Sequence, residues 1–244
     1  MKLESEVEAF RAEASRLVSA CPKCDGSLTN LDCDCVRKYH FEVEAYEACI
    51  PQDFWYTKSE DITHNVKTFN RYVKRYVKRL SVAQRRGYGL LFSGANGVGK
   101  SMFISYVLAN AIRRGRSAYY TTLVGLDHDL KRGFDEPEAR ERLEYMLTSD
   151  FLGLDEMTKE VFKSIDKPTW LRTQVERILK QRFDENRPVL MATNASGTQI
   201  AEVYGTTIAS LIEGKYKTLF MEPGDVRRTL GKRMTSEMGW DDEA

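Results

Sequence analysis

The segment that most constrains the fold is Gly94–Ser101, because its sequence, GANGVGKS, matches the pattern G-x-x-x-x-G-K-[ST] in full. An apolar run (YGLLFSG) precedes it and an amphipathic run (MFISYVLANAIRR) follows it, which predicts a strand, a loop and a helix in that order. In such a loop, glycines let backbone N–H groups and the helix N-terminus face a phosphate. The pattern therefore predicts a phosphate-binding loop; the alternative is a glycine-rich turn with a chance lysine.

The residues of this loop have separate expected roles. Lys100 would reach the β- and γ-phosphates of ATP as a point charge and act in catalysis, while the Ser101 hydroxyl would hold Mg²⁺. We expect the remaining contacts with the nucleotide to come from Gly94, Ala95, Asn96, Gly97, Val98 and Gly99.

Two further apolar runs end in polar residues that fit the same chemistry. FLGLDE (151–156) would form a buried strand that presents Asp155 to Mg²⁺, with Glu156 placed to orient or deprotonate a water molecule. VLMATN (189–194) would bring the amide of Asn194 to the γ-phosphate or to that water molecule. The alternatives are a helix cap for the acidic pair and a simple turn for Asn194.

Short apolar runs alternate with helical patterns after Gly87. The apolar runs lie at 88–94, 117–123, 150–156, 188–194 and 217–223. The helical patterns lie at 100–114, 125–147, 169–185 and 198–213. This alternation predicts an α/β domain with a five-stranded parallel sheet that is covered by helices on both faces.

The first 86 residues follow other patterns. Residues 3–19 predict an amphipathic helix, residues 21–35 are polar and cysteine-rich, and residues 65–86 predict a basic helix with an apolar inner face. We therefore predict three parts, which are an N-terminal helical and cysteine-rich module (1–60), a basic linker helix (61–86) and the α/β domain (87–244).

Four of the five cysteines lie within 15 residues, and these are Cys21, Cys24, Cys33 and Cys35. Their pattern, C-x2-C-x8-C-x-C, offers four thiolates to a tetrahedral Zn²⁺, and a chain without secretory features favours metal over disulfides. His40 could replace one thiolate, and reduced cysteines without metal are the alternative. Because four protein ligands leave no open position, such a zinc ion would fold the module rather than catalyse.

The charges are balanced overall, with 37 Lys and Arg against 36 Asp and Glu, but they are unevenly distributed. Residues 1–60 carry 12 acidic and 7 basic side chains, which favours a protein partner, whereas residues 65–86 carry 8 basic and no acidic ones. The basic helix could follow a phosphate backbone or form a solvated face. No apolar run has the length of a membrane helix and the N-terminus lacks a signal-peptide pattern, so we expect a cytoplasmic protein without a membrane partner.

Over residues 21–230, the chain resembles the AAA+ ATPases of the DnaC/DnaI-type replicative-helicase loaders and the related IstB-type transposition helpers. The resemblance rests on the cysteine segment, ACIPQDFW (48–55), GANGVGKS, FLGLDE, and VLMATN preceded by NRP. The cysteine segment and ACIPQDFW look more like the loaders, notably those encoded by phages or prophages.

The resemblance implies a P-loop ATPase that hydrolyses ATP weakly or under stimulation by a partner. It also implies that the N-terminal module engages a hexameric replicative helicase and that the ATPase domain binds single-stranded DNA and self-associates. For the DNA it points to Lys131 and Arg132, in the segment after the second strand. Tyr119 and Tyr120 lie within that strand, where at least one of them is expected in the core.

The chain departs from the family pattern at two places. The loaders usually carry an arginine before the last strand that reaches the ATP of a neighbouring subunit, but residues 208–214 contain none. Arg227, which follows the last strand, is the remaining candidate for a nucleotide contact. In addition, Met157-Thr158 replaces the aliphatic-Gly pair that more usually follows the acidic pair.

Three functions compete with that of a helicase loader. One is an IstB-like transposition helper, which has the same motifs. Another is a binding module that holds ATP with little turnover, because an arginine acting in trans can raise the hydrolysis rate by orders of magnitude. A P-loop small-molecule kinase is disfavoured by the acidic pair Asp155-Glu156 and by Asn194 at the end of its strand.

Overall fold

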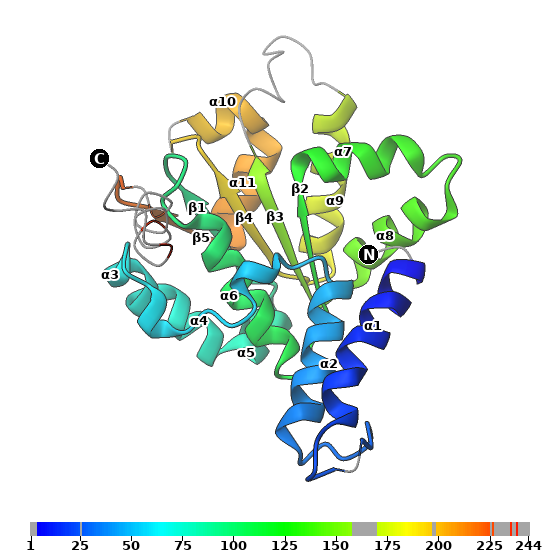
Figure 1. Ribbon diagram of the computed structural model, residues 1–244. Helices are drawn as coiled ribbons and strands as arrows, with labels where there is room; N and C mark the ends of the chain where they lie inside the picture. The colour runs from blue at the N-terminus through cyan, green and yellow to red at the C-terminus, as the bar shows by residue number, and fades with distance from the viewer. Residues whose placement is uncertain are drawn as a thin grey trace.

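Five apolar segments form one parallel sheet in the order β2-β3-β4-β1-β5 (Figure 1). The strands are β1 (Gly89–Ser93), β2 (Ala118–Thr122), β3 (Phe151–Met157), β4 (Val189–Thr193) and β5 (Tyr216–Phe220). This computed structural model describes residues 4–24, 26–157, 170–196 and 199–224, together with residues 226, 235 and 238. The predicted five-stranded parallel sheet is confirmed.

Helices cover both faces of the sheet, as predicted. One face packs against α6 (Lys100–Ile112), which is joined there by α2 (Asp34–Glu47) and by the helical run 66–86. The other face packs against the later helices, which are α7 (Leu123–Arg132), α8 (Pro137–Thr148), α9 (Trp170–Asp184), α10 (Ile200–Tyr204) and α11 (Thr206–Lys215). All five residues of β1 and all five of β4 are buried, which explains why these strands read as continuous apolar runs.

Gly153 lets α6 pack closely against the middle of the sheet. A Cβ atom at this position would lie 2.6 Å from Cγ2 of Ile104 and 2.8 Å from Cδ1 of Leu108, both on α6. Real Cβ atoms do not approach other heavy atoms so closely, so a side chain here would push α6 away. The glycine in FLGLDE therefore holds α6, and the loop at its N-terminus, close to β3.

Three of the predicted helices are interrupted. The run predicted at 65–86 contains α3 (Val66–Thr68), a π-helix at Phe69–Val73, α4 (Lys74–Lys78) and α5 (Leu80–Arg86). The run predicted at 125–147 divides into α7 and α8, because Pro137 begins a new helix. The run predicted at 198–213 divides at Gly205, whose φ of +90° no ordinary helix residue adopts.

The N-terminal helices form a hairpin, and its base shares a core with the sheet. α1 (Glu4–Ser19) packs against α2, and Figure 1 shows the hairpin projecting away from the sheet. Phe41 and Trp55 are buried in the same apolar cluster as α6. Arg113, at the end of α6, stacks its guanidinium 3.9 Å from the ring centre of Phe41 and donates a hydrogen bond to the carbonyl of Trp55. The hairpin is therefore fixed directly to α6.

No helix among residues 4–24, 26–157, 170–196 and 199–224 has both the length and the apolar character needed to cross a bilayer.

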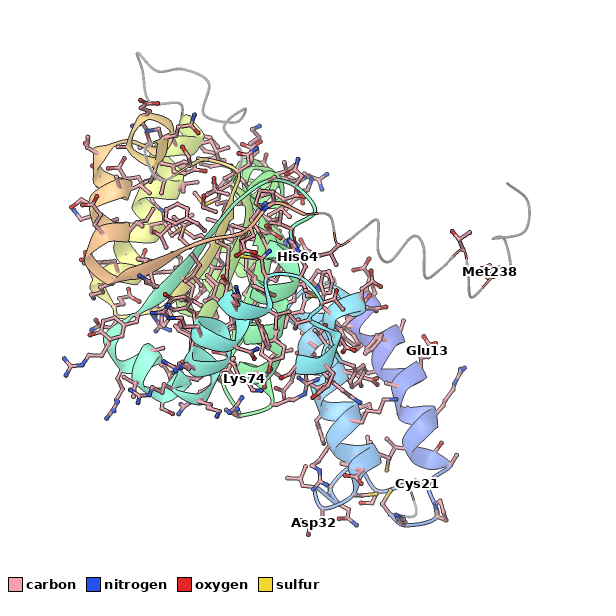
Figure 2. The ribbon with its side chains drawn as sticks, turned by 90° about the vertical axis from the view of Figure 1, so that its left-hand side faces the viewer. Glu13, Cys21, Asp32, His64, Lys74 and Met238 are labelled. Carbon is pink, nitrogen blue, oxygen red and sulfur yellow. The ribbon has the colours of Figure 1, made fainter. Side chains whose placement is uncertain are left out.

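Asn65 fastens the segment before α3 to both the phosphate loop and the end of β5. Its side-chain amide donates to the carbonyls of Val98 and Glu222, each at 3.3 Å, and its Oδ1 accepts from the backbone N–H of Glu222 at 2.7 Å. Nearby, a ring nitrogen of His64, which Figure 2 labels, lies 3.0 Å from the same Glu222 carbonyl. Asn65 is buried and has a φ of +55°, a left-handed conformation that asparagine tolerates better than most residues.

We predict that Asn65→Gly lowers the free energy of unfolding by about 1–3 kcal/mol, because the buried partners lose their hydrogen bonds. Asn65→Ala should lower it further, since alanine at a φ of +55° adds backbone strain. Urea denaturation of the three proteins measures both effects. A value for Asn65→Gly within about 0.5 kcal/mol of the wild type, the range of ordinary surface changes, would show that the hydrogen bonds contribute little.

Candidate nucleotide-binding site and cysteine cluster

The phosphate loop connects β1 directly to α6 at the carboxyl edge of the sheet. Gly97 and Gly99 have φ values of +81° and +96°, so two left-handed residues turn the backbone back toward the helix. The buried side chain of Val98 anchors the loop from below, and the backbone N–H of Gly94 donates to the carbonyl of Thr193 at 3.2 Å. The loop therefore places the first N–H groups of α6, a helix of 13 residues, at the edge of an open cleft.

Lys100 and Ser101 are the first two residues of α6, and both line this cleft. The Lys100 ammonium donates to the carbonyls of Gly94 and Ala95, at 2.8 and 2.7 Å. These hydrogen bonds hold its charge inside the curve of the loop, where a phosphate group would face it.

Asp155 is 2% exposed, and two donors orient its carboxylate. The hydroxyl of Tyr120 donates to Oδ2 at 2.6 Å, and the backbone N–H of Glu156 donates to Oδ1 at 2.7 Å. The pKa of Tyr120 is raised, first by burial and then by the charge of Asp155, so its hydroxyl stays protonated and remains a donor. From the sequence, Tyr120 is expected only within the strand, and no sequence pattern pairs it with Asp155.

Glu156 lies on a bulge that turns its side chain out of the sheet. The β3–β4 register passes from Leu154 opposite Met191 to Met157 opposite Thr193, so β3 carries an additional residue at this point. Glu156 has a φ of +53°, an unfavourable value for a residue with a Cβ atom, and its side chain is exposed in the cleft. Such strain is concentrated at functional sites, where the surrounding structure enforces it.

A buried polar network holds the ends of β3 and β4 together beside the cleft. The Thr193 hydroxyl donates to the carbonyl of Met157 at 2.8 Å and accepts from the N–H of Ala195 at 3.0 Å. The Tyr204 hydroxyl, from α10, donates to the same carbonyl at 2.6 Å and contacts Thr193. Next to this network, Oδ1 of Asn194 is buried and has no hydrogen-bond partner among the described residues. No sequence pattern identifies Tyr204 as part of the site.

The cleft has a volume of about 1040 Å³. The predicted site residues that line it are Asn96, Gly97, Gly99, Lys100, Ser101, Asp155, Glu156 and Asn194, whereas Gly94, Ala95 and Val98 are not part of its lining. Its opposite wall comes from the segment 53–63, through Asp53, Phe54, Tyr56, Thr57, Glu60, Asp61 and Thr63. From the sequence, most of this segment is expected in the partner-docking module. The structure instead places it against the phosphate loop, and the run ACIPQDFW was the only sequence signal there.

The residues of the cleft fit a nucleoside triphosphate with Mg²⁺. The helix N-terminus and Lys100 supply positive potential, while the Ser101 hydroxyl and the Asp155 carboxylate are the oxygen ligands that Mg²⁺ prefers. The unpartnered Oδ1 of Asn194 adds a buried polar atom that a ligand or a water molecule can satisfy. This donor set supports the predicted ATP and Mg²⁺ site.

Arg227 lies outside the described residues, as does Thr158 of the Met157-Thr158 pair. Val226, the residue before Arg227, lines the cleft, and its backbone N–H donates to the carbonyl of Gly97 at 2.8 Å. α11, the helix before the last strand, contains no arginine. The role of Arg227 therefore stays a prediction.

The four clustered cysteines meet at the end of the α1–α2 hairpin farthest from the sheet, where Figure 2 labels Cys21. Their sulfur atoms lie within 4.8 Å of one another, and the separations are 3.8 Å for Cys21–Cys33, 3.4 Å for Cys24–Cys35 and 3.2 Å for Cys33–Cys35. Four thiolates around one Zn²⁺ at about 2.3 Å would stand roughly 3.8 Å apart. The cluster therefore has the size of a zinc site, and all its cysteines are free.

The surroundings of the cluster bear on which ligands a metal would use. His40 is not in the cluster. One of its ring nitrogens instead lies 3.1 Å from the carbonyl of Leu28. Cys49 is also outside it. The backbone N–H of Lys23 and the Cys35 thiol lower the pKa of Cys21 to about 7, so this residue readily forms the thiolate that binds metal.

The candidate DNA residues lie on α7, and both are paired with acidic neighbours. The Lys131 ammonium lies 2.5 Å from Asp127, and Nε of Arg132 lies 3.1 Å from Glu136. Tyr119 and Tyr120 are both buried in β2, so the expectation that at least one belongs to the core is confirmed.

Comparison with known proteins supports the assignment of fold and family. A search among curated protein sequences finds no significant match. Among solved structures, the fold is similar to that of the DnaC helicase loader, at 22% identity and a TM-score of 0.60 over 70% of this chain and 100% of that one. It is also similar to DnaI, at 21% identity and a TM-score of 0.58 over 70% and 94% of the two chains.

A third similar structure is the replication initiator DnaA bound to AMPPCP and single-stranded DNA, at 14% identity and a TM-score of 0.58 over 78% of this chain and 56% of that one. The model of the family described as IstB-like ATP binding protein matches residues 59–211, which include the phosphate loop, Asp155, Glu156 and Asn194. Since this match spans more than half of the chain, the chain belongs to the family of IstB-like ATP-binding proteins.

Proposed function

We propose that this chain is an ATP-dependent helicase loader for DNA replication, which binds ATP with Mg²⁺, single-stranded DNA and a hexameric replicative helicase. The observation that carries the proposal is that the hairpin with the cysteine cluster packs on α6, the helix that begins at the phosphate loop. A partner held by the hairpin and a nucleotide held by the loop would then act on one rigid element. The structural match extends over the whole of the DnaC helicase loader chain, and this similarity of fold supports the same proposal.

Five residues of the cleft have defined parts in ATP hydrolysis under this proposal. Lys100 holds the β- and γ-phosphates, and Ser101 and Asp155 hold Mg²⁺, which when bound neutralises the charge on those phosphates. Glu156 orients or deprotonates the attacking water, and Asn194 contacts that water or the γ-phosphate. Because α11 carries no arginine, turnover is weak or depends on a partner, and Arg227 is the candidate for the missing contact.

DNA contact and self-association complete the proposal. Lys131 and Arg132 lie on an exposed part of α7, where surface ion pairs of little net stability leave them available to a phosphate. Self-association through the ATPase domain would bring a second chain to the nucleotide cleft. Both features are what the resemblance to the loaders implies, and the DnaA structure with bound single-stranded DNA has a similar fold.

A transposition helper is the second candidate, and the family match favours it equally, since the matched residues 59–211 hold the motifs that both classes share. The part of the chain that distinguishes a helicase loader from a transposition helper is the hairpin, which lies before the matched residues. A binding module that holds ATP with little turnover is the third candidate, which rests on the absence of arginine from α11.

We predict that Lys100→Ala loses tight ATP binding while the fold stays intact, because the ammonium faces the loop rather than the core. Glu156→Gln should keep ATP affinity within about two-fold and lower turnover by about 10²–10⁴-fold, the range for a general base. Nucleotide titration and phosphate release measure the two properties, with circular dichroism as the control for folding. Wild-type ATP affinity in Lys100→Ala would remove the assignment of the loop.

A companion prediction concerns the strain at Glu156. The free energy of unfolding of Glu156→Gly should equal that of the wild type or exceed it by up to about 1 kcal/mol, because glycine adopts a φ of +53° without strain. The variant should nevertheless lack ATP turnover, so stability and activity separate at one position. Loss of more than about 1 kcal/mol in thermal or urea unfolding would show that the side chain stabilises the fold.

For the cysteine cluster, we predict about one zinc per chain by metal analysis, as four thiolates require. Chelation should raise hydrogen exchange around Val18 and Val36, which pack against the cysteines, but leave ATP affinity unchanged. Cys33→Ser should lose the metal, whereas the matched control Cys49→Ser should keep it. Metal-free protein with the same exchange protection at residues 18–36 would end the zinc assignment.

The partner test uses an apolar side chain at the end of the hairpin. Leu31 is 62% exposed there, so Leu31→Asp should weaken binding to the replicative helicase by at least about ten-fold (~1.4 kcal/mol). The matched control is Phe134→Asp, at a 78% exposed position between α7 and α8, which should bind the helicase like the wild type. Both variants should keep ATP affinity. Equal helicase affinity in Leu31→Asp and the wild type would move the partner surface to the ATPase core.

A further inference from the structure

A second hollow lies at the end of the sheet opposite the nucleotide cleft, and we call it the basic groove. It runs between the helical segment 71–83 and the first residues of β1 and β5. Because strands of a parallel sheet all point the same way, the amino ends of β1 and β5 lie away from the phosphate loop. Five cations line the groove, and these are Arg71, Arg75, Lys78, Arg79 and Lys217.

These cations have no acidic partner among the residues that the structure describes. None of the five forms an ion pair within the part of the chain that the structure describes. Residues 62–126 contain 12 Lys and Arg and no Asp or Glu, so local sequence supplies no counter-charge either. Arg71, Arg75 and Arg79 recur every four residues, which places positive charges about 6 Å apart along the helical run. Figure 2 shows nitrogen-tipped side chains around α4, where Lys74 is labelled.

The contrast with α7 is informative, because each candidate DNA cation there is paired with an acidic neighbour. Lys131 lies beside Asp127 and Arg132 beside Glu136, whereas the groove concentrates uncompensated charge. A cluster of like charges repels itself, so it favours the binding of a polyanion.

Tyrosine rings are interleaved with the charges. The ring of Tyr72 lies near two cations, with the guanidinium carbon of Arg71 at 5.3 Å and the ammonium of Lys217 at 5.7 Å from its centre. Tyr88 is 47% exposed on the groove wall, and its backbone carbonyl accepts a hydrogen bond from the Tyr76 hydroxyl at 2.6 Å. This bond helps to hold the backbone of Tyr88, and with it an exposed ring, next to the cations.

We propose that the basic groove binds single-stranded nucleic acid, with the phosphates on the cations and a base stacked on Tyr88. Positive grooves combined with flat aromatic rings are the usual means of holding a single strand without reading its sequence. An acidic protein segment would satisfy the charges but would leave the exposed ring without a stacking partner. The groove is also separate from α7, since β2, which leads into α7, and β5 are the two opposite edge strands of the sheet.

The test compares two double variants that remove the same charge from the same segment. Arg75→Gln/Arg79→Gln removes two groove cations, and Arg85→Gln/Arg86→Gln removes two exposed cations of α5 that do not line the groove. A third, Lys131→Gln/Arg132→Gln, reports on α7 separately. Binding of a fluorescein-labelled oligothymidylate to the full-length chain is followed by anisotropy between about 50 and 200 mM salt.

We expect the groove variant to bind about ten-fold more weakly at the lower salt concentration. The slope of log K against log[salt] should fall in magnitude by about 1.4, which corresponds to two lost phosphate contacts on a single strand. The α5 variant should keep the wild-type slope. Equal losses in these two variants, or an unchanged groove variant, would overturn the proposal. A loss confined to the α7 variant would also overturn it, while leaving the proposed function intact.

Tyr88 provides the test for the class of ligand. Tyr88→Ala should weaken oligothymidylate binding by about ten-fold through lost stacking, whereas Tyr88→Phe, which keeps the ring, should bind like the wild type. Poly-glutamate of matched charge should compete poorly and should not distinguish these variants. If poly-glutamate competes as well as the oligonucleotide and Tyr88→Ala has no effect, the groove binds an acidic polypeptide and the proposal is wrong.

Discussion

The structure depends on the position of β1 between two parallel neighbours. A strand that pairs on both sides cannot shift, so Gly94, the residue after it, is fixed by its hydrogen bond to Thr193. The loop must then turn within six residues into α6, which two left-handed glycines allow. Because the carboxyl ends of parallel strands meet at one edge, this placement brings Lys100, Asp155 and Asn194 into one cleft.

Around this edge, strained and polar groups are held by buried partners. Glu156 keeps a left-handed backbone between an aspartate fixed by Tyr120 and a Met157 carbonyl that accepts two buried hydroxyls. Polar networks of this kind are stable in a low-dielectric interior only when their members are satisfied, and a satisfied network is rigid. The bulge can therefore present a carboxylate to the cleft at a fixed position, as a residue that orients water requires.

Sequence patterns predicted the sheet, the loop and the acidic strand end because each is local. A buried strand, a glycine-rich turn and a helix follow from consecutive residues, and so does a cluster of four cysteines within 15 positions. Contacts between segments that are distant in the sequence were not predictable. Tyr120 donates a hydrogen bond to Asp155, 35 positions later on the neighbouring strand, and Asn65 accepts one from Glu222, 157 positions later. The same reason applies to the segment 53–63, which forms a wall of the cleft only because α2 and Trp55 pack against α6.

The arrangement places the nucleotide cleft and the two proposed binding surfaces, which are the hairpin and the basic groove, on one continuous core. α6 runs from the phosphate loop to Arg113, which holds the base of the hairpin, and β1 runs from the basic groove to the same loop. A nucleotide can change the affinity of either distant surface only if it binds two arrangements of this core unequally, and any such effect is reciprocal. The phosphate loop leads directly into α6, and Arg113 at the other end of α6 holds the base of the hairpin. A change of arrangement at the loop would therefore reach the hairpin through α6 as a rigid body.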